Sequence, residues 1–205
     1  MSLQGLAYDF TVQLLNTTIT EAIAVLFGVA SVILANRNNM LLYPTGIIST
    51  GLYLYIMSSV GLYAETLLNG YYLVMSIYGW IRWVKNREDG KASAISYCTA
   101  KDWIMVGAIV ILGFAILYTT LSKYTDSTVP FADALVSAFA WAGMWLLAKH
   151  KIENWILLNV SNFIAIPLLV YKGIPMTALL TVILFTVAMF GYFRWRKLYH
   201  LQFAQ

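Results

Sequence analysis

The chain has 205 residues, of which 60% are hydrophobic and only 11% charged, and its mean hydropathy is +0.73. Soluble domains usually carry about 25% charged residues, so this composition excludes an ordinary soluble protein and indicates a membrane protein. The net charge of +4 and the pI of about 9.1 require no nucleic acid, because the basic residues follow a membrane topology.

Seven segments are long and apolar enough, or nearly so, to cross a bilayer as helices, which takes roughly 20 mostly apolar residues. They lie at about 20–36, 40–58, 64–84, 102–121, 131–148, 152–171 and 176–195. Residues 1–19 precede them and predict an interfacial segment, because this stretch is at best amphipathic.

Lysine and arginine residues fall mainly on one side of the predicted membrane. All but Lys123 and Lys172 lie in the loops after the first, third, fifth and seventh segments. Under the positive-inside rule, this bias predicts an external N-terminus and a cytoplasmic C-terminus.

The sequence also repeats itself at an offset of 112 positions. Residues 21–83 align without a gap on residues 133–195, and Gly79-Trp80-Ile81-Arg82-Trp83 falls on Gly191-Tyr192-Phe193-Arg194-Trp195. In an apolar chain such a duplication predicts a transporter of two structural repeats with its substrate site between them. Because each repeat has three spans and one further span links them, both repeats should enter the membrane in the same direction.

We therefore predict an all-α membrane protein with seven transmembrane helices in a 3+1+3 arrangement of parallel repeats. The expected parts are an interfacial segment at 1–19, a first repeat at 20–85, a linker at 86–130, a second repeat at 131–197 and a cytoplasmic tail at 198–205. The linker comprises a cytoplasmic loop, a single helix and an outer loop.

The start of the sixth predicted span holds the first candidate site. Trp155, Asn159 and Asn162 are spaced i, i+4 and i+7, so they share one helix face. Polar groups facing lipid would lack partners, so these side chains should face protein or a water-filled cavity. Alternatively, the amides join helices by hydrogen bonds and Trp155 belongs to an interfacial aromatic belt.

Two other spans carry further candidates. Asn69 and Tyr72 lie on one face of the third span, one turn after Glu65, which is equally consistent with a carboxylate at the membrane interface. Trp141 and Trp145 are spaced i and i+4 on the fifth span and could wall a slot for a flat cationic ring. For these two tryptophans, plain packing against lipid or neighbouring helices is the alternative.

The remaining polar residues argue against an enzyme. His150 and His200 are the only histidines, and both lie in basic cytoplasmic segments without a metal-ligand cluster. No glycine-rich phosphate loop or ATP-binding domain is visible, so we expect no catalytic site, metal or cofactor. Glu21 and Asp133, at equivalent helix starts, fit a shared structural role, because acids stabilise helix N-termini. A small passive or gated carrier remains.

Several of these features resemble the PnuC family of bacterial vitamin transporters, over about residues 20–197. They are the 3+1+3 plan, the Gly-Leu-Tyr-Ala-Glu run and its continuation at 61–72, the Gly-Trp-Ile-Arg-Trp run at 79–83, and Glu153-Asn154-Trp155. The resemblance implies a fold similar to that of the SWEET sugar transporters, a homotrimer, and a location in the bacterial inner membrane. It also implies facilitated diffusion of unphosphorylated nicotinamide riboside, or of thiamine or riboflavin in related branches, with a cytoplasmic kinase trapping the product.

One departure from the family pattern bears on the substrate. Nicotinamide riboside members are similar in carrying Trp-x-x-Trp-x-x-x-Asn on the sixth span; Trp155 and Asn162 match it, but Leu158 replaces the second tryptophan. Loss of an aromatic wall should cost about 1–2 kcal/mol of cation–π attraction. The sequence therefore favours thiamine, with nicotinamide riboside as the alternative. Riboflavin transport and a membrane role other than transport rank lower.

Overall fold

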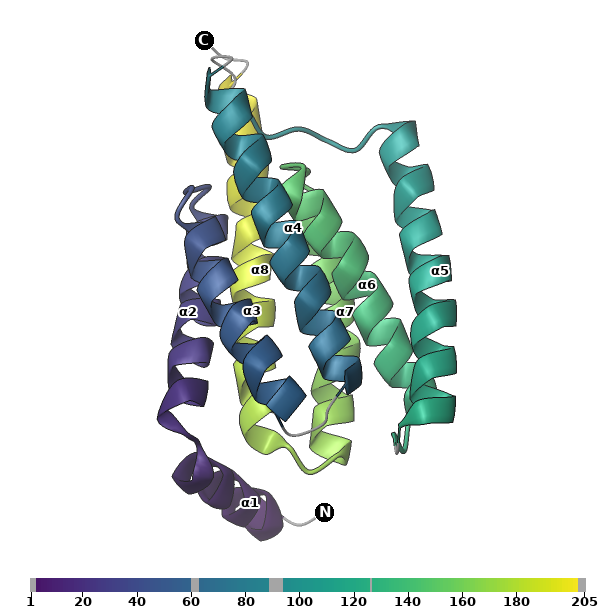
Figure 1. Cartoon of the computed structure of the whole chain (residues 1–205). Helices are drawn as coiled ribbons and strands as arrows, with labels where there is room; N and C mark the ends of the chain where they lie inside the picture. The colour runs from purple at the N-terminus through teal and green to yellow at the C-terminus, as the bar shows by residue number, and fades with distance from the viewer. Residues whose placement is uncertain (1–2, 60–62, 89–93, 126, 203–205) are drawn as a thin grey trace.

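The computed structural model describes residues 3–59, 63–88, 94–125 and 127–202, which contain eight α-helices (Figure 1). Their bounds are α1 Leu3–Asn16, α2 Ile19–Asn36, α3 Leu42–Ser59, α4 Tyr63–Glu88, α5 Ala100–Tyr124, α6 Pro130–Ala148, α7 Asn154–Tyr171 and α8 Pro175–Gln202. Helix α8 continues to Gln202, so it includes residues 198–202 of the expected cytoplasmic tail.

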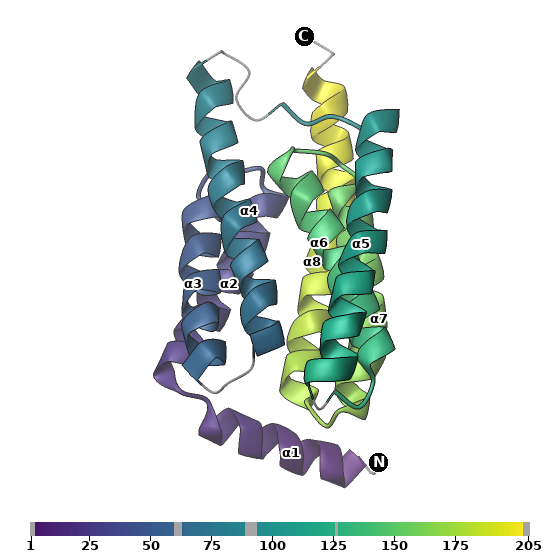
Figure 2. The ribbon, with the colours of Figure 1, turned by 45° about the vertical axis from the view of Figure 1, so that its right-hand side comes forward.

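Helix α1 lies across one end of the bundle rather than along it (Figure 2). The Gln13 side chain ties it to the turn between α7 and α8, donating to the Gly173 carbonyl at 2.9 Å and accepting from the Met176 amide at 3.2 Å. After the break at Thr17 and Thr18, α2 begins with a capping box between Thr18 and Glu21. We call this end of the molecule the α1 end, and the opposite end the C-terminal end.

The remaining helices form two groups of three, α2–α4 and α6–α8, with α5 packed mainly on α6 (Figure 2). Between the groups, α2 packs against α8 and α6 packs against α4. At the offset of 112 positions α2 corresponds to α6 and α4 to α8, so these two contacts are equivalent. Hydrogen bonds recur in the same way. The Ser49 hydroxyl donates to the Ala24 carbonyl, and the Ser161 hydroxyl donates to the Val136 carbonyl, both at 2.8 Å. The donor and the acceptor of the second bond lie 112 positions after those of the first.

Close helix packing recurs at this offset as well. A Cβ atom on Gly79 would collide with the ring of Tyr43, and a Cβ atom on Gly191 would collide with the indole of Trp155. Asn38 and His150, which follow α2 and α6, both adopt a positive φ, of 51° and 55°. The two groups therefore share turns, glycine contacts and buried hydrogen bonds.

Five of the described helices are long and apolar enough to cross a membrane: α2, α5, α6, α7 and α8. The sequence predicted spans at α3 and α4 too, but neither meets that measure. Both helices supply many of the polar residues of the internal cavity, and α4 also runs on to a charged end at Arg87 and Glu88. Polar lining residues thus lower the apolar character of the two helices that carry them.

Candidate functional site

A cavity of about 390 Å³ lies between the two groups of helices, within the size range of small-molecule sites. Residues of α2, α3, α4, α6, α7 and α8 line it. Most of them occur as pairs 112 positions apart, such as Tyr43 with Trp155 and Thr50 with Asn162. The cavity therefore follows the interface between the repeated halves of the sequence.

The lining is apolar with a few neutral polar groups. The polar and aromatic members are Ser31, Tyr43, Ser49, Thr50, Tyr53, Asn69, Tyr72, Ser76, Ser137, Trp155, Ser161, Asn162 and Thr181. None of the residues found to line it is acidic or basic. A cation inside would have to be held by ring faces and by amide and hydroxyl oxygens.

On α7, the cavity-lining face is centred on Leu158 and includes both Trp155 and Asn162. Asn159 was expected on the same face but does not line the cavity. It lies one residue from Leu158, hence about 100° around the helix axis, and its buried Oδ1 has no hydrogen-bond partner in the described part of the chain. Trp155, Asn159 and Asn162 do lie on one broad side of the helix, as their i, i+4, i+7 spacing predicted. The cavity, however, meets the part of that side around Leu158 rather than the part around Asn159.

Trp155 is fully buried and held in place by its neighbours. The indole meets the ring of Trp195 edge-on, with centroids 5.5 Å apart and planes at 90°, and it covers Gly191. Its Nε1 donates to no residue of the described ranges. The indole therefore forms a rigid part of the cavity wall.

Asn69 and Tyr72 of α4 also line the cavity, as the polar stripe of the third predicted span indicated. The side chain of Glu65 lies outside the described residues. Tyr71 points elsewhere: its hydroxyl donates to the Trp141 carbonyl at 3.0 Å and its ring stacks on the Trp141 indole at 4.7 Å.

The aromatic slot expected from Trp141 and Trp145 is not part of the cavity lining. Trp141 packs between Tyr71 and Gly113 of α5, and Trp145 packs in the cluster that joins α5, α6 and α7, with Lys149 Nζ 4.2 Å from its ring centroid. The packing alternative describes both residues better. Helix α5 covers this side of α6, and nothing in the sequence indicated which side that would be.

Sequence reasoning missed Tyr43, Thr50 and Tyr53, three lining residues of α3. The repeat could have found two of them, because Tyr43 and Thr50 are the counterparts of Trp155 and Asn162. Tyr53 has only Ala165 as its counterpart, so no predicted site residue pointed to it.

Comparison with known proteins decides the family. The model of the family described as "Nicotinamide mononucleotide transporter" matches residues 18–197. The chain belongs to this family. It is 22% identical over 200 residues to the nicotinamide riboside transporter PnuC of Escherichia coli K12, covering 85% of this chain and 84% of the relative. It is 25% identical over 193 residues to the protein of the same name from Neisseria mucosa, covering 86% and 72%.

A solved structure has the same fold. The crystal structure of the vitamin B3 transporter PnuC aligns with a TM-score of 0.71 and 24% identity, over 97% of this chain and 89% of the other. Membership of a transporter family, together with several membrane-length apolar helices, makes this chain a multi-pass membrane protein.

In this family member, an aromatic cluster lies at the C-terminal end of the cavity, which Tyr43 and Trp155 line. It comprises Tyr43, Trp83, His150, Trp155 and Trp195, which come from both halves. His150 stacks on Trp195 with centroids 5.9 Å apart and planes at 5°, and lies 4.7 Å from Trp83. Burial, helped by the nearby Arg82 guanidinium, lowers the pKa of His150 to about 4, so its ring is neutral at physiological pH.

Two hydrogen bonds join the halves beside this cluster. Trp195 Nε1 donates to the Ala35 carbonyl and Asn36 Nδ2 to the Val187 carbonyl, both at 2.9 Å. The contacts between the halves at this end are therefore both aromatic and polar.

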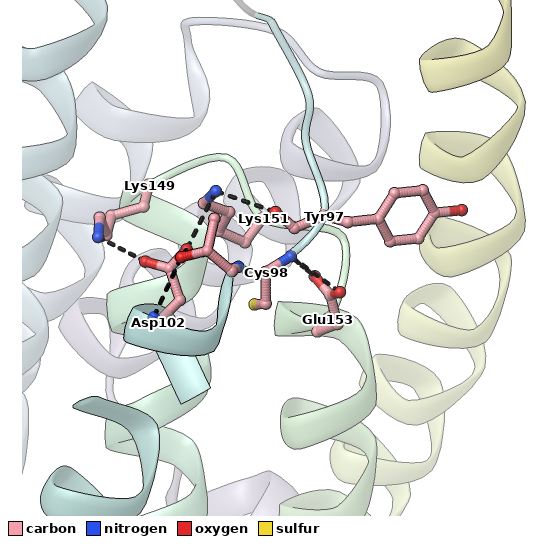
Figure 3. A network of polar contacts seen from close by, with 7 residues as sticks. Tyr97, Cys98, Asp102, Lys149, Lys151 and Glu153 are labelled. Atoms are coloured by element: carbon pink, nitrogen blue, oxygen red, sulfur yellow. Dashed lines mark hydrogen bonds and ion pairs between the residues drawn. The ribbon is translucent and has the colours of Figure 1, made fainter. Parts of the chain in front are cut away.

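A polar network fixes the turn that precedes α7 (Figure 3). Asp102 at the start of α5 pairs with Lys149 at 2.7 Å and Lys151 at 3.2 Å, and both carboxylate oxygens of Glu153 accept from the Cys98 amide at 2.9 Å. Burial and the Glu153 carboxylate raise the pKa of the Cys98 thiol to about 12. The network holds the chain before α5 against the α6–α7 turn, from which the helix carrying Trp155 begins.

Proposed function

We propose that this protein carries nicotinamide riboside across the bacterial inner membrane. The observation that carries the proposal is the cavity between the two halves, which Trp155 and Asn162 of α7 and Asn69 and Tyr72 of α4 all line. Its support from comparison is that the relatives named above are nicotinamide riboside transporters.

The lining chemistry suits this vitamin. Its pyridinium ring is a flat cation, which the faces of Trp155, Tyr72 and Tyr53 can attract without a carboxylate. Its carboxamide and ribose hydroxyls need hydrogen-bond partners, which Asn162 and Asn69 can supply. A ligand that lacks these groups would leave the Asn162 amide without a partner inside the cavity, which is costly, so such a site discriminates against it.

Thiamine is the second candidate, and one observation favours it. Leu158 lines the cavity where the nicotinamide riboside pattern has a second tryptophan, so one aromatic wall is absent. Thiamine is also a cation with a flat ring, and its aminopyrimidine edge could bond to the same amides. The comparisons favour nicotinamide riboside over thiamine, the substrate that the sequence alone favoured.

The proposed mechanism is facilitated diffusion with trapping by a cytoplasmic kinase. No charged residue was found to line the cavity, which fits a carrier without proton coupling. We propose seven spans in two parallel three-helix repeats, with the α1 end outside and the C-terminal end inside, and a homotrimer as the family resemblance implies. The aromatic cluster and cross-half hydrogen bonds would then hold the cytoplasmic end closed while the site faces outward.

Calorimetry on the purified protein tests the substrate, using nicotinamide riboside, thiamine and riboflavin as ligands. We expect nicotinamide riboside to bind most tightly, and Leu158→Trp, which restores the second tryptophan, to strengthen its binding relative to thiamine. Tighter binding of thiamine by the unaltered protein, lost in Leu158→Trp, would overturn the assignment in favour of the second candidate.

Flux into liposomes tests the mechanism. We expect the internal concentration of unmodified vitamin to equal the external one and to exceed it only when the matching kinase and ATP are enclosed. Accumulation without a kinase that an uncoupler abolishes would exclude facilitated diffusion.

A further inference from the structure

Two acidic residues occupy the same place in the two halves but have different surroundings. Asp133, in the first turn of α6, pairs with Lys172 at 2.6 Å and accepts a hydrogen bond from Ser127 at 2.6 Å. Glu21, in the first turn of α2, makes only a capping contact with the Thr18 amide at 3.4 Å. Within the described ranges no basic side chain pairs with Glu21, so its charge stays uncompensated while that of Asp133 is neutralised.

Glu21 lies on the cavity-lining face of its helix. Val25, Gly28 and Val32, at i+4, i+7 and i+11 from it, all line the cavity. Glu21 is therefore one helical turn beyond the lining toward the α1 end, and it is only partly buried. It is also close enough to Tyr53, which lines the cavity from α3, for its carboxylate to act electrostatically on that side chain.

We propose that Glu21 is an entry site for a cationic vitamin, drawing it to the α1 end of the cavity before it reaches the rings and amides inside. The assignment rests on the proposed function in one respect, that the cargo is a cation. A carboxylate near a cavity with low-dielectric walls raises the local concentration of cations and hence their association rate. Asp133 cannot do the same, because Lys172 already compensates its charge.

The charge of Glu21 can be separated from its structural role. Glutamine at the third helical position closes a capping box as glutamate does, so Glu21→Gln removes the charge and keeps the cap. Thr18→Ala is the matched control, because it breaks the capping box and keeps the charge. A loss of transport caused by helix fraying would appear in Thr18→Ala, whereas a loss caused by charge would appear only in Glu21→Gln.

The test is the association rate of nicotinamide riboside with the purified full chain in detergent, followed by stopped-flow tryptophan fluorescence. At low ionic strength Glu21→Gln should lower the association rate constant about fivefold, as expected for one unit charge close by in water. The dissociation rate should stay unchanged, and added salt should remove the difference. The reduced, uncharged dihydro form of the ligand should bind equally fast to both proteins.

Equal association rates for the unaltered protein and Glu21→Gln at low salt would overturn the proposal, as would an equal loss in Thr18→Ala or with the uncharged ligand. If the unaltered protein does not bind nicotinamide riboside, the proposed substrate fails instead. Thiamine, which is also a cation, is then the probe, and the same comparison of the variants decides the role of Glu21.

Discussion

Replacement of Gly191 by alanine should displace the indole of Trp155 into the cavity. Gly191 is buried on α8, and a Cβ atom there would lie 2.8 Å from the Cδ2 and Cε2 atoms of Trp155 and 2.9 Å from its Cε3 atom. Contacts this short require one group to move. Trp155 and Trp195 are both fully buried and in edge contact, so we expect the indole to yield toward the cavity that it lines.

The expected magnitude combines two opposing terms. Overpacking a close-packed site costs about 1–3 kcal/mol, whereas alanine in place of glycine in a helix contributes about 1 kcal/mol. The free energy of unfolding of Gly191→Ala should therefore fall by roughly 0–2 kcal/mol. Gly107 of α5 is the matched control, because a Cβ atom there would have no neighbour within 4 Å, so Gly107→Ala should gain stability.

The assay is thermal unfolding in detergent together with calorimetric binding of nicotinamide riboside. Displacement of the ring should remove its cation–π attraction of about 1–2 kcal/mol, which weakens binding about tenfold. Gly107→Ala should bind normally. If Gly191→Ala were as stable as Gly107→Ala and bound the vitamin with unchanged affinity, Trp155 would not be a rigid wall of the substrate site.

Three further outcomes follow from the same structure. Asn162→Leu should weaken nicotinamide riboside binding about tenfold in calorimetry while the protein stays folded, since a substrate hydrogen-bonding group loses its partner; unchanged affinity would remove Asn162 from the site. Ser49→Ala and Ser161→Ala should each lower the unfolding free energy by about 0.6 kcal/mol, and clearly unequal losses would argue against equivalent roles for their hydrogen bonds. The pKa of His150 is lowered from 6.5 to about 4 in the folded state. Between pH 6.5 and pH 4 the unfolded chain therefore binds the proton more readily than the folded protein does. The free energy of unfolding should fall by up to about 3 kcal/mol as the pH decreases through that range. His150→Phe should abolish this part of the pH dependence of unfolding.

The sequence predicted residues of the cavity lining where helix face and family pattern agreed; that they bind substrate stays a prediction. Trp155 and Asn162 satisfied both, and both line the cavity, as do Asn69 and Tyr72 from a simple polar stripe. Helical spacing alone was insufficient for Trp141 and Trp145. It shows that two side chains share a face, but which face meets the cavity depends on where the linking helix packs, and α5 occupies that side of α6.

The repeat would have been the better guide to the missing residues, because equivalent positions meet the same interface. Applied to Trp155 and Asn162 it selects Tyr43 and Thr50, which do line the cavity. It cannot select Tyr53, since a duplicated scaffold preserves the position of a side chain and not its chemistry.

That distinction explains how a duplicated scaffold can hold an asymmetric ligand. At equivalent positions α4 presents Tyr72 where α8 has Leu184, so the two walls differ in the hydrogen-bonding groups that they offer. The glycine of one helix contact also differs between the halves. In the first half Gly46 of α3 contacts Ser31 of α2, whereas in the second half the equivalent positions are Leu158 of α7 and Gly143 of α6. A Cβ atom on Gly143 would lie 2.8 Å from Leu158, so glycine is what admits a large side chain at 158. A tryptophan at that position would have to extend into the cavity, so we expect the size of residue 158 to set the space left for the ring of the proposed substrate.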